Sequence, residues 1–475
     1  MVTGAGTAAI TVAAVLVAVA SLPWWLPGRV VALRVRLFAR INGDEGIPVP
    51  GDLIGVEHFR EVYSHPAAGG RSKGAALSDL FWYWLAPGPE VHQEHLEAGE
   101  RYDQVAAATR RFLAIPRGEA EELARRCTAE VLRETDTGAP RTVRLRDLMM
   151  PVWAAFSYEL VFGGPCPPAA RDLIVAHADD VATALTCCGL RHMDRRARLT
   201  RYVAARLDQV RHPLPDGLSD EERAFYVQGT FFNTAVVQMA EAMAHLLLVL
   251  ARHPEAQETA RTGDDAALDR VINETLRLYP LFGVAHRITT GDIELDGGPT
   301  IPAGSVLCFN YPEFHRAGFT DPGRFDPDRF RPDRREDGRA VRDLNHIPFG
   351  VAANRPCPAW RLAPIAVRAA ARETVRRYVL ASSASHVRSL PNRGPCLLIP
   401  RAGSDAPPEP GSHRAALLRM RARDRCEDVG RSVLQLVRGA RMVREARRLR
   451  LCERHFAADG TAERPTDQPV PPHVT

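Results

Sequence analysis

The sequence predicts a mainly α-helical protein with a minor β part. Stretches rich in Ala, Leu and Arg, such as Tyr102–Leu113, have helical periodicity. A Pro-free stretch over residues 219–253 predicts one very long helix, and its apolar side chains cover most of the circumference. Such a helix is buried in the centre of a large domain. Short β-patterned segments follow late in the chain, at Ile293–Leu295 and Val306–Phe309, and predict a small sheet.

The composition excludes several classes of protein. The chain has 475 residues, 45% of them hydrophobic, so it is neither a disulfide-stapled miniprotein nor a disordered chain. A net charge of +5 gives no support for nucleic-acid binding. Nine Cys without any Cys-x-x-Cys spacing indicate neither a zinc site nor a disulfide framework. This leaves a large, reduced, intracellular domain in which one particular Cys can matter.

An N-terminal membrane anchor is predicted over residues 1–28. No charged side chain precedes Arg29, and Ala8–Leu26 is nearly all apolar, which is long enough to cross a bilayer. Trp24 and Trp25 lie where an interfacial aromatic belt is expected. Basic residues follow directly, and the positive-inside rule then predicts that the rest of the chain is cytoplasmic.

A cleaved signal peptide is the alternative interpretation, with residues 18–20 as the cleavage site. We favour the anchor because a signal peptide has its basic stretch before the apolar segment, whereas here the basic residues come after it. Pro23 and Pro27 are expected to end the helix.

The C-terminal part differs in composition from the middle. Residues 403–411, rich in Pro, Gly, Ser and Asp, predict a linker, and residues 412–475 form an Arg-rich extension that is helical from Arg414 to His455. Residues 403–475 contain 14 Arg and 10 acidic residues, so most of the excess charge lies there. Either this helix binds a surface, at anionic lipid or an acidic partner, or it is a solvated helix packed on the domain.

The long helix begins at a capping box. In Ser219-Asp220-Glu221-Glu222 the Ser hydroxyl can accept an amide proton from the first turn, and the third residue after it, Glu222, can reach back to the Ser amide.

Two motifs predict a buried ion-pair cluster. Glu274 and Arg277 are three residues apart on one helical face within an apolar setting. A buried pair needs a further partner for its remaining donors and acceptors. Arg329, between two Phe on the Pro-restrained turn 325–330, can supply it and lock the turn to the helix.

A third motif contains the candidate metal ligand. Residues 348–359 are mostly small, so their backbone can approach a flat ligand, and Cys357 comes just before a helical stretch from Trp360 onward. A thiolate at a helix start gains from the amide dipoles, which is expected to lower its pKa and suit it to bind iron. Arg355 is placed to neutralise a carboxylate.

In this order and spacing the three motifs resemble the cytochrome P-450 superfamily, the haem-thiolate oxygenases. The resemblance covers residues 45–402 and implies one domain of that fold, with the long helix over haem b and Cys357 as the axial ligand. It also implies that Glu274, Arg277 and Arg329 form the structural triad behind the haem. Its implied haem-binding residues are Arg355 and Arg287 on the propionates, Phe349 of the Cys loop, and His92.

The Cys loop and the His92 segment depart from the family pattern. Phe349 lies eight residues before Cys357 instead of seven, so one residue is inserted. Ala353 and Ala359 stand where the family has Gly. His92 resembles a helix His that touches propionate in bacterial members, but the Arg expected four residues later is Leu96. The small side chains still allow haem to bind.

The long helix also departs from the pattern. The family places an acid–alcohol pair there that relays protons to dioxygen. Counting back from Pro254 puts Val237 at the acid and Gln238 at the alcohol, while a shift of one turn brings Thr234 or Glu241 to the haem. We take Gln238 and Thr234 as the candidate catalytic residues of an unusual relay.

The expected function is a membrane-anchored monooxygenase that oxidises a hydrophobic small molecule in secondary metabolism. The chain has no Gly-rich dinucleotide fingerprint, so electrons are expected from a separate reductase or ferredoxin. The missing acid–alcohol pair leaves open a haem-thiolate isomerase, dehydratase or peroxygenase. Non-catalytic haem binding is the remaining alternative, because the triad and the propionate residues serve haem retention.

Overall fold

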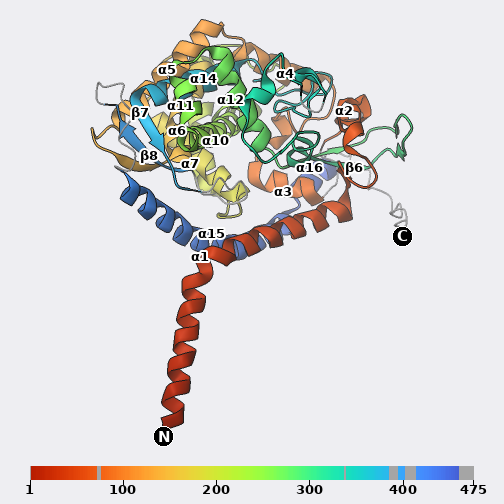
Figure 1. Ribbon diagram of the computed structural model, residues 1–475. Coiled ribbons are helices and arrows are strands. Elements are labelled where there is room, and N and C mark those ends of the chain that lie inside the picture. The colour runs from red at the N-terminus through yellow and green to blue at the C-terminus, as the bar shows by residue number, and fades with distance from the viewer. Residues whose placement is uncertain (1, 72–75, 336–337, 385–393, 402–412, 459–475) are drawn as a thin grey trace.

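The computed structural model describes residues 2–71, 76–335, 338–384, 394–401 and 413–458 (Figure 1). The body is mostly helical, with small sheets at its periphery, as the sequence predicts. The α-helices are α1 (Val2–Glu45), α2 (Phe59–Ser64), α3 (Ala76–Leu85), α4 (Glu100–Leu113), α5 (Arg117–Glu134), α6 (Leu145–Phe162), α7 (Pro168–Leu185), α8 (Met193–Ala204), α9 (Asp220–Val227), α10 (Val236–Arg252), α11 (Pro254–Thr262), α12 (Asp265–Leu278), α13 (Tyr311–Phe314), α14 (Leu362–Arg377), α15 (Arg414–Leu449) and α16 (Leu451–Ala458). The shorter helical segments are η1 (Val56–His58), η2 (Pro66–Gly69), η3 (Pro89–Val91), η4 (Leu207–Gln209), η5 (Gln228–Ala235), η6 (Pro327–Phe330) and η7 (Val341–Asp343).

The strands form small sheets in which no strand is longer than six residues among those described. In one sheet of order β1-β6-β3, β1 runs parallel and β3 antiparallel to β6, with Arg287 of β3 opposite Leu307. In the second, of order β2-β8-β7, all neighbours are antiparallel, and β4 pairs with β5 alone. The bounds are β1 (Ile47–Val49), β2 (Arg141–Arg144), β3 (Val284–Ile288), β4 (Ile293–Glu294), β5 (Thr300–Ile301), β6 (Val306–Asn310), β7 (Tyr378–Ala381) and β8 (Pro395–Pro400).

One continuous helical rod of 33 residues, Asp220–Arg252, runs through the body as α9, η5 and α10. The Ser219 hydroxyl accepts from the Glu222 amide, and the Glu222 carboxylate accepts from the Ser219 amide at 2.8 Å, so the predicted capping box forms. The middle segment η5 is a π-helix, a rare form that is frequent at functional sites. The predicted long central helix is therefore confirmed, with a local widening that the sequence pattern does not reveal.

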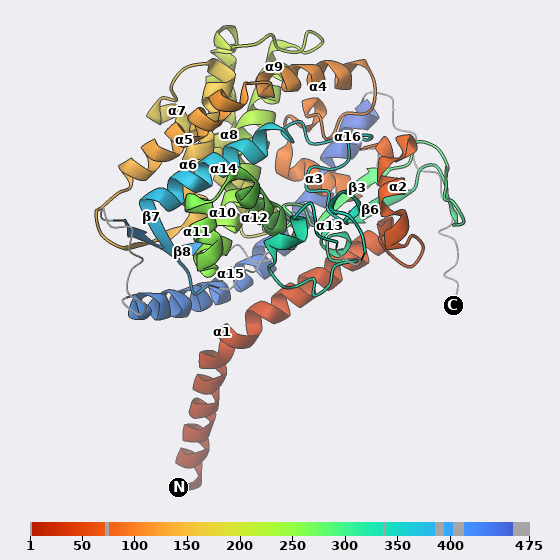
Figure 2. The same cartoon turned by 45° about the horizontal axis from the view of Figure 1, so that its top comes forward.

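The core packs around α10, which contacts α6 and α14 (Figure 2). Large side chains such as Trp153, Phe231 and Phe232 are almost fully buried there. The apolar content of the central rod is high enough for a membrane span, but 61% of its most apolar window is buried by its neighbours, so it is a core helix.

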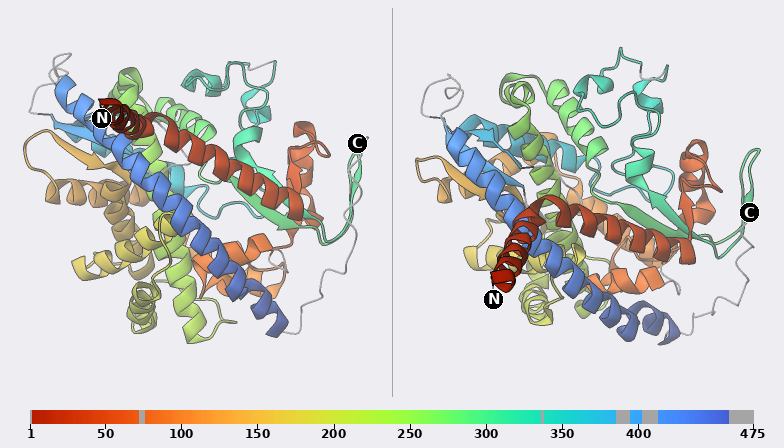
Figure 3. Two further views of the ribbon diagram at one scale, coloured as in Figure 1. Left: turned by 90° about the horizontal axis from the view of Figure 1, so that it is seen from below. Right: turned by 60° about the horizontal axis from the view of Figure 1, so that its bottom comes forward.

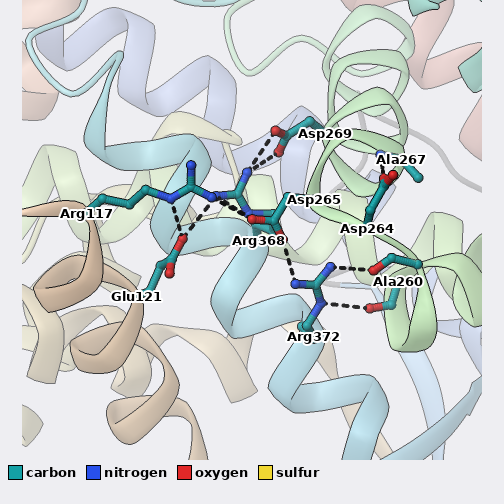
Figure 4. Close-up of polar contacts among 10 residues, drawn as sticks. Arg117, Glu121, Ala260, Asp264, Asp265, Ala267, Asp269, Arg368 and Arg372 are labelled. Atoms are coloured by element: carbon teal, nitrogen blue, oxygen red, sulfur yellow. Dashed lines mark hydrogen bonds and ion pairs between the residues drawn. The ribbon is translucent and has the colours of Figure 1, made fainter.

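A network of ion pairs ties α14 to α5 and α12 (Figure 4). Both Asp269 carboxylate oxygens accept from Arg368 Nη1 at 2.8 Å, and Glu121 accepts from Arg368 Nη2 at 3.2 Å. Arg372, one turn further on α14, pairs with Asp265 at 2.7 Å. Arg368 is 5% exposed, so its charge depends on these partners.

The helices α1 and α15, near the two ends of the chain, contact each other beneath the body. The N-terminal half of α1 projects away from the body, and the remainder turns and lies against α15 (Figures 1 and 3). The expectation that Pro23 and Pro27 end the first helix was wrong, because α1 continues through both to Glu45. Each proline removes one backbone hydrogen bond, which bends a helix without ending it when neighbouring turns are intact. The predicted linker 403–411 lies outside the described residues.

Replacing Arg368 with Gln is expected to lower the free energy of unfolding by about 2 kcal/mol, because the charge-assisted hydrogen bonds to Asp269 and Glu121 are lost. Denaturant titration followed by circular dichroism measures the change. Arg125→Gln is the matched control, since Arg125 is 46% exposed and pairs with Glu122 within the same helix. Its expected cost is less than about 0.5 kcal/mol. Equal losses in both variants would contradict the structural role of the Arg368 network.

Candidate functional site

The loop before α14 is closed by hydrogen bonds at its base and anchored from outside. The Cys357 amide donates to the Phe349 carbonyl at 2.9 Å, and Val351 bridges Asn354 across the turn. The buried Asn354 amide donates to the carbonyls of Tyr63 at 3.1 Å and His65 at 3.0 Å. Asn354 thus ties the loop to the end of α2. Sequence reasoning missed this residue because its partners lie almost 300 positions earlier.

Gly350 and Arg355 have left-handed backbone conformations, with φ of 75° and 51°. A Cβ at Gly350 would lie 3.0 Å from the Tyr63 hydroxyl, so only Gly fits there without displacement. The inserted residue of this loop is accommodated by the turn at Val351–Asn354. Ala353, at the position where Gly was expected, is exposed at the tip of this turn.

The Cys357 thiol is accessible although it lies deep in the molecule. The Cys357 residue has exposed surface, but the surrounding protein desolvates the sulfur and raises the pKa of the thiol to about 11. A hydrogen bond from the Ala359 amide lowers this pKa only in part. Both observations fit a thiol that lines an interior hollow. The expectation of a lowered pKa was therefore wrong for the free thiol. The helix begins only at Leu362, so its amide dipoles do not reach the sulfur, and desolvation dominates.

Three guanidinium groups interact electrostatically beside this loop: those of the buried Arg71 and Arg287 and that of the partly buried Arg355. Arg287 Nη1 donates to the Tyr63 carbonyl at 2.9 Å, and Arg355 Nη1 donates to the Leu96 carbonyl. Burial, and after it repulsion from Arg71, lowers the pKa of Arg355. Burial and repulsion from Arg71 also lower the pKa of Arg287.

Several nitrogens of these groups have no hydrogen-bond partner among the described residues. They are Arg287 Nε, Arg355 Nη2 and all three guanidinium nitrogens of Arg71. Glu94 compensates part of the charge, since its carboxylate lies 3.5 Å from Arg71 Nη2. Burial opposes its ionisation, but Arg71 and Arg287 hold the pKa of Glu94 below its usual range. The cluster still has more positive charge and more donors than Glu94 alone can satisfy.

Arg71 was not identified from the sequence. It follows η2 in an irregular segment, so no periodicity or motif marks it, and only the fold brings it to Arg287 and Arg355. The side chain is 4% exposed, and its backbone amide donates to both Glu97 carboxylate oxygens at 3.0 and 3.1 Å. Leu96, where the family pattern has Arg, is a buried apolar residue.

His92 lies beside this cluster, in a turn after η3 and not on a helix as its resemblance implied. Pro87 and Pro89 together with the left-handed Gly88 prevent a helix there. The Glu94 amide donates to His92 Nδ1 at 3.2 Å, so in neutral His92 the proton is on Nε2. Nε2 lies 3.2 Å from Thr234 Oγ1. Burial lowers the pKa of His92, which keeps this donor neutral.

The π-helix and α10 present one partly accessible face that includes Thr234, Gln238 and Ala242. Val237, which counting back from Pro254 predicts to stand at the family's acid position, is 5% exposed and packs in the core. Glu241, the other candidate from a shifted alignment, is paired with the buried Arg146 of α6 at 2.7 Å. Through its contact with His92, Thr234 connects this face to the arginine cluster.

Glu274, Arg277 and Arg329 lie together behind the loop. Arg277 donates to Glu274 twice, at 2.7 and 2.8 Å, and Arg329 Nε lies 3.6 Å from the same carboxylate. The Asp326 amide also donates to Glu274 at 3.0 Å. All three side chains are at most 2% exposed. The cluster fastens α12 to η6.

The arrangement fits a flat, dianionic metal cofactor. It offers an accessible thiol as metal ligand, buried guanidinium nitrogens with unused hydrogen-bonding capacity for two carboxylates, and a loop of mostly small residues. Haem b has these features: an iron that accepts an axial thiolate and two propionates. A separate depression of about 560 Å³ between α8 and α9, lined by Thr200 and Glu221 among others, contains none of these residues.

Comparisons with known proteins agree with this geometry. Residues 190–402, which include the triad and the Cys loop, match the family described as cytochrome P-450. Cyclooctat-9-en-7-ol 5-monooxygenase of Streptomyces melanosporofaciens is 31% identical over 157 residues, covering 29% of this chain and 33% of the relative. Cytochrome P-450 3A13 of Mus musculus is 29% identical over 151 residues, 28% of this chain and 29% of the relative. The chain thus aligns with about a third of the length of the curated relatives it matches.

Solved structures share the fold. CYP175A1 of Thermus thermophilus superposes with a TM-score of 0.56 at 20% identity, covering 74% of this chain and 88% of that one. The cyanobacterial CYP120A1 gives a TM-score of 0.56 at 17% identity over 72% and 86% of the two chains. The family match over the Cys loop and the triad, the curated relatives and the shared fold together support the cytochrome P-450 superfamily for this chain, and members of that superfamily bind haem through a cysteine thiolate.

Proposed function

We propose that this protein is a haem-thiolate monooxygenase that oxidises a hydrophobic small molecule, with Cys357 as the axial ligand. The observation that carries the proposal is an accessible Cys357 thiol beside three arginines, several of whose buried nitrogens lack hydrogen-bond partners in the described part of the chain. A dianionic metalloporphyrin satisfies both features at once. The Streptomyces relative is, by its name, a monooxygenase of a cyclic alcohol, which supports an apolar substrate of the kind used in secondary metabolism.

When bound, a thiolate-ligated haem supplies the chemistry that favours O–O cleavage. The chain's own residues hold and tune it. Arg71, Arg287 and Arg355 would neutralise the propionates, and Phe349 would pack in the Cys loop beside the ring. Cys357 must lose its proton on ligation, which the metal's charge offsets. Glu274, Arg277 and Arg329 would keep α12 and η6 fixed behind the loop.

Proton delivery is proposed to run along the face of the central helix. Gln238 lies on the accessible side one turn after Thr234, and its amide can orient a water molecule although it cannot itself donate a free proton. Thr234 is held by His92 Nε2 and can pass a proton through its hydroxyl. Electrons are proposed to come from a separate reductase or ferredoxin.

Membrane attachment through α1 is the proposed location of the enzyme, with the catalytic part cytoplasmic. The most apolar 18-residue window of the segment Thr11–Arg34 has a mean hydropathy of 1.6, and none of that window is buried in the body. An apolar helix near an N-terminus also fits a signal sequence. Flotation of the full-length protein with vesicles, together with N-terminal sequencing, distinguishes an uncleaved anchor from a cleaved signal sequence. An anchor would bring the active site close to a lipophilic substrate that partitions into the bilayer.

A second candidate is a haem-thiolate enzyme that does not use external electrons, such as an isomerase, dehydratase or peroxygenase. The core-facing Val237 favours it, because the family's acid is absent at that position. Turnover without any reductase would support this candidate over the monooxygenase.

Replacing Cys357 with Ala is expected to abolish the thiolate-type Soret band of the reduced, carbon monoxide-bound protein, because the axial sulfur is removed. Absorption spectroscopy of the purified protein measures this. Cys426→Ala, which removes the other exposed thiol, is the matched control and should keep the band. A thiolate-type band that persists in the Cys357 variant would refute Cys357 as the ligand.

Replacing Arg71 with Leu is expected to speed haem loss to an acceptor globin about tenfold or more, since a buried charged hydrogen bond contributes about 1.5–3 kcal/mol. Haem transfer followed by absorbance measures the rate. Arg361→Leu is the control, because Arg361 is exposed beside the same loop. Unchanged haem loss in the Arg71 variant would show that this arginine does not bind the propionates.

Replacing Gln238 with Ala is expected to raise the hydrogen peroxide released per NADPH consumed, because proton delivery is disturbed. The measurement uses a surrogate ferredoxin and reductase. Val237→Ala serves as the control on the buried side of the same turn, and it should leave this ratio unchanged. If the Gln238 variant keeps the wild-type ratio, the relay does not pass through this residue.

A further inference from the structure

The C-terminal helix α15 is fixed to the body by specific contacts along one face. Arg144 of β2 pairs with Asp424 at 3.3 Å, and Gln435 Nε2 donates to the Thr186 carbonyl at 3.0 Å. Trp84 Nε1 lies 3.0 Å from the Met442 sulfur. The buried positions recur every three or four residues, at Met420, Asp424, Asp428, Ser432, Gln435, Gly439, Met442 and Ala446. This inner face fixes the rotation of α15 about its axis, and so defines the outer face.

Unlike the buried inner face, the outer face of α15 carries exposed valines in its centre and exposed arginines toward both ends. In its middle lie Val433, 49% exposed, and Val437, 65% exposed. Arginines occur at both ends of this apolar stretch and are exposed: Arg419, Arg423, Arg441, Arg444 and Arg448. Helical spacing places all these residues about half a turn from the buried stripe.

The four carboxylates of α15 do not compensate this outer charge. Asp424 and Asp428 belong to the buried stripe, where Arg144 and Arg431 pair with them. Glu427 is part of the same cluster and reaches outward only to Arg423. Glu445 is half-buried and interacts with Tyr83 of α3. Within this helix, the outer face is thus apolar in the centre and cationic at both ends, with one of its five arginines, Arg423, paired to Glu427 at 2.7 Å.

The position of α15 relates this face to α1. The two helices contact each other along the underside of the body, and α15 lies across the place from which the N-terminal half of α1 projects (Figures 1 and 3). Arg425 of α15 lies 5.5 Å over the ring of Trp24, at the end of the apolar segment of α1. A membrane surface that α1 enters at Trp24 would therefore run along the outer face of α15.

We propose that the outer face of α15 lies on the surface of an anionic lipid bilayer, parallel to the plane that α1 crosses. This proposal rests on the membrane attachment proposed above. Valines in the centre would enter the acyl boundary, while the arginines at both ends would contact lipid phosphates. An acidic protein partner explains the arginines, but it does not explain the apolar centre or the alignment with α1. The extension would then fix the tilt of the body over the membrane.

The test uses the full-length holoenzyme with an environment-sensitive fluorophore on Cys426, an exposed residue of the same outer face. The vesicles contain phosphatidylcholine alone or with about 30% phosphatidylserine, an anionic lipid of the cytoplasmic leaflet, and flotation first measures binding. We expect a blue shift of the probe, and quenching by brominated acyl chains, in the anionic vesicles. A control probe at Glu122→Cys in the Cys426→Ser background, on the exposed side of α5, should show neither change.

Charge variants make the test specific. Replacing all three of Arg441, Arg444 and Arg448 by Gln should reduce the response of the probe to anionic vesicles at least about fivefold, because each surface arginine adds to the attraction to anionic lipid. Replacing Arg110, Arg133 and Arg376 with Gln removes the same charge from exposed positions elsewhere and should leave the response unchanged. If both triple variants behave alike, the effect is one of net charge and the proposed face is refuted.

The remaining outcomes separate this proposal from the one on which it rests. If the protein floats with vesicles but the Cys426 probe stays in water, α1 is an anchor and α15 does not touch lipid. If the protein does not float at all, membrane attachment and the α15 surface are both refuted. A probe that responds to soluble poly-glutamate but not to anionic vesicles would assign the face to an acidic protein partner and overturn the lipid proposal.

Discussion

Buried positive charge that needs an anion is the constraint on which the site depends. Arg71, Arg287 and Arg355 come from three distant segments, and each has at least one buried nitrogen without a hydrogen-bond partner among the described residues. Leaving such groups buried without partners costs several kcal/mol, so the fold is expected to be most stable with a dianionic ligand in place. Glu94 supplies part of the needed charge. Cofactor binding and stability of the loop region are therefore coupled in this protein.

One backbone carbonyl links that charge to the metal ligand. The Tyr63 carbonyl accepts from Arg287 and from Asn354, so the arginine cluster and the Cys loop share an anchor at the end of α2. The Tyr63 ring also lies 3.8 Å from the Arg287 guanidinium. Any shift of α2 would move the loop and the cluster together, which preserves their relative position. The Glu274 cluster and the Arg368 network hold the opposite side through α12 and α14.

The central helix shows how a protein can keep the family's architecture and change a catalytic element. Its capping box, length and burial are those of a core rod, and its π-turn widens the helix at residues 228–235. The accessible face presents a hydroxyl and an amide, and the expected carboxylate position is a core valine. An amide can orient water but does not titrate, so in the proposed relay the proton would be supplied through bound water and through the neighbouring Thr234 and His92.

The sequence by itself determined the helical class, the long central helix, the small sheets and the family, because these follow from periodicity, capping chemistry and the spacing of motifs within single segments. It also marked Glu274, Arg277, Arg329 and Cys357 as a group, since their chemistry is local or carried by a motif. Tertiary structure decided the rest. Asn354 has hydrogen-bond partners almost 300 residues away, and Arg71 meets Arg287 and Arg355 only through the fold, so no local pattern encodes either residue's place in the site. The free Cys357 has a raised pKa because burial, which only packing sets, outweighs the helix dipole that the sequence suggested.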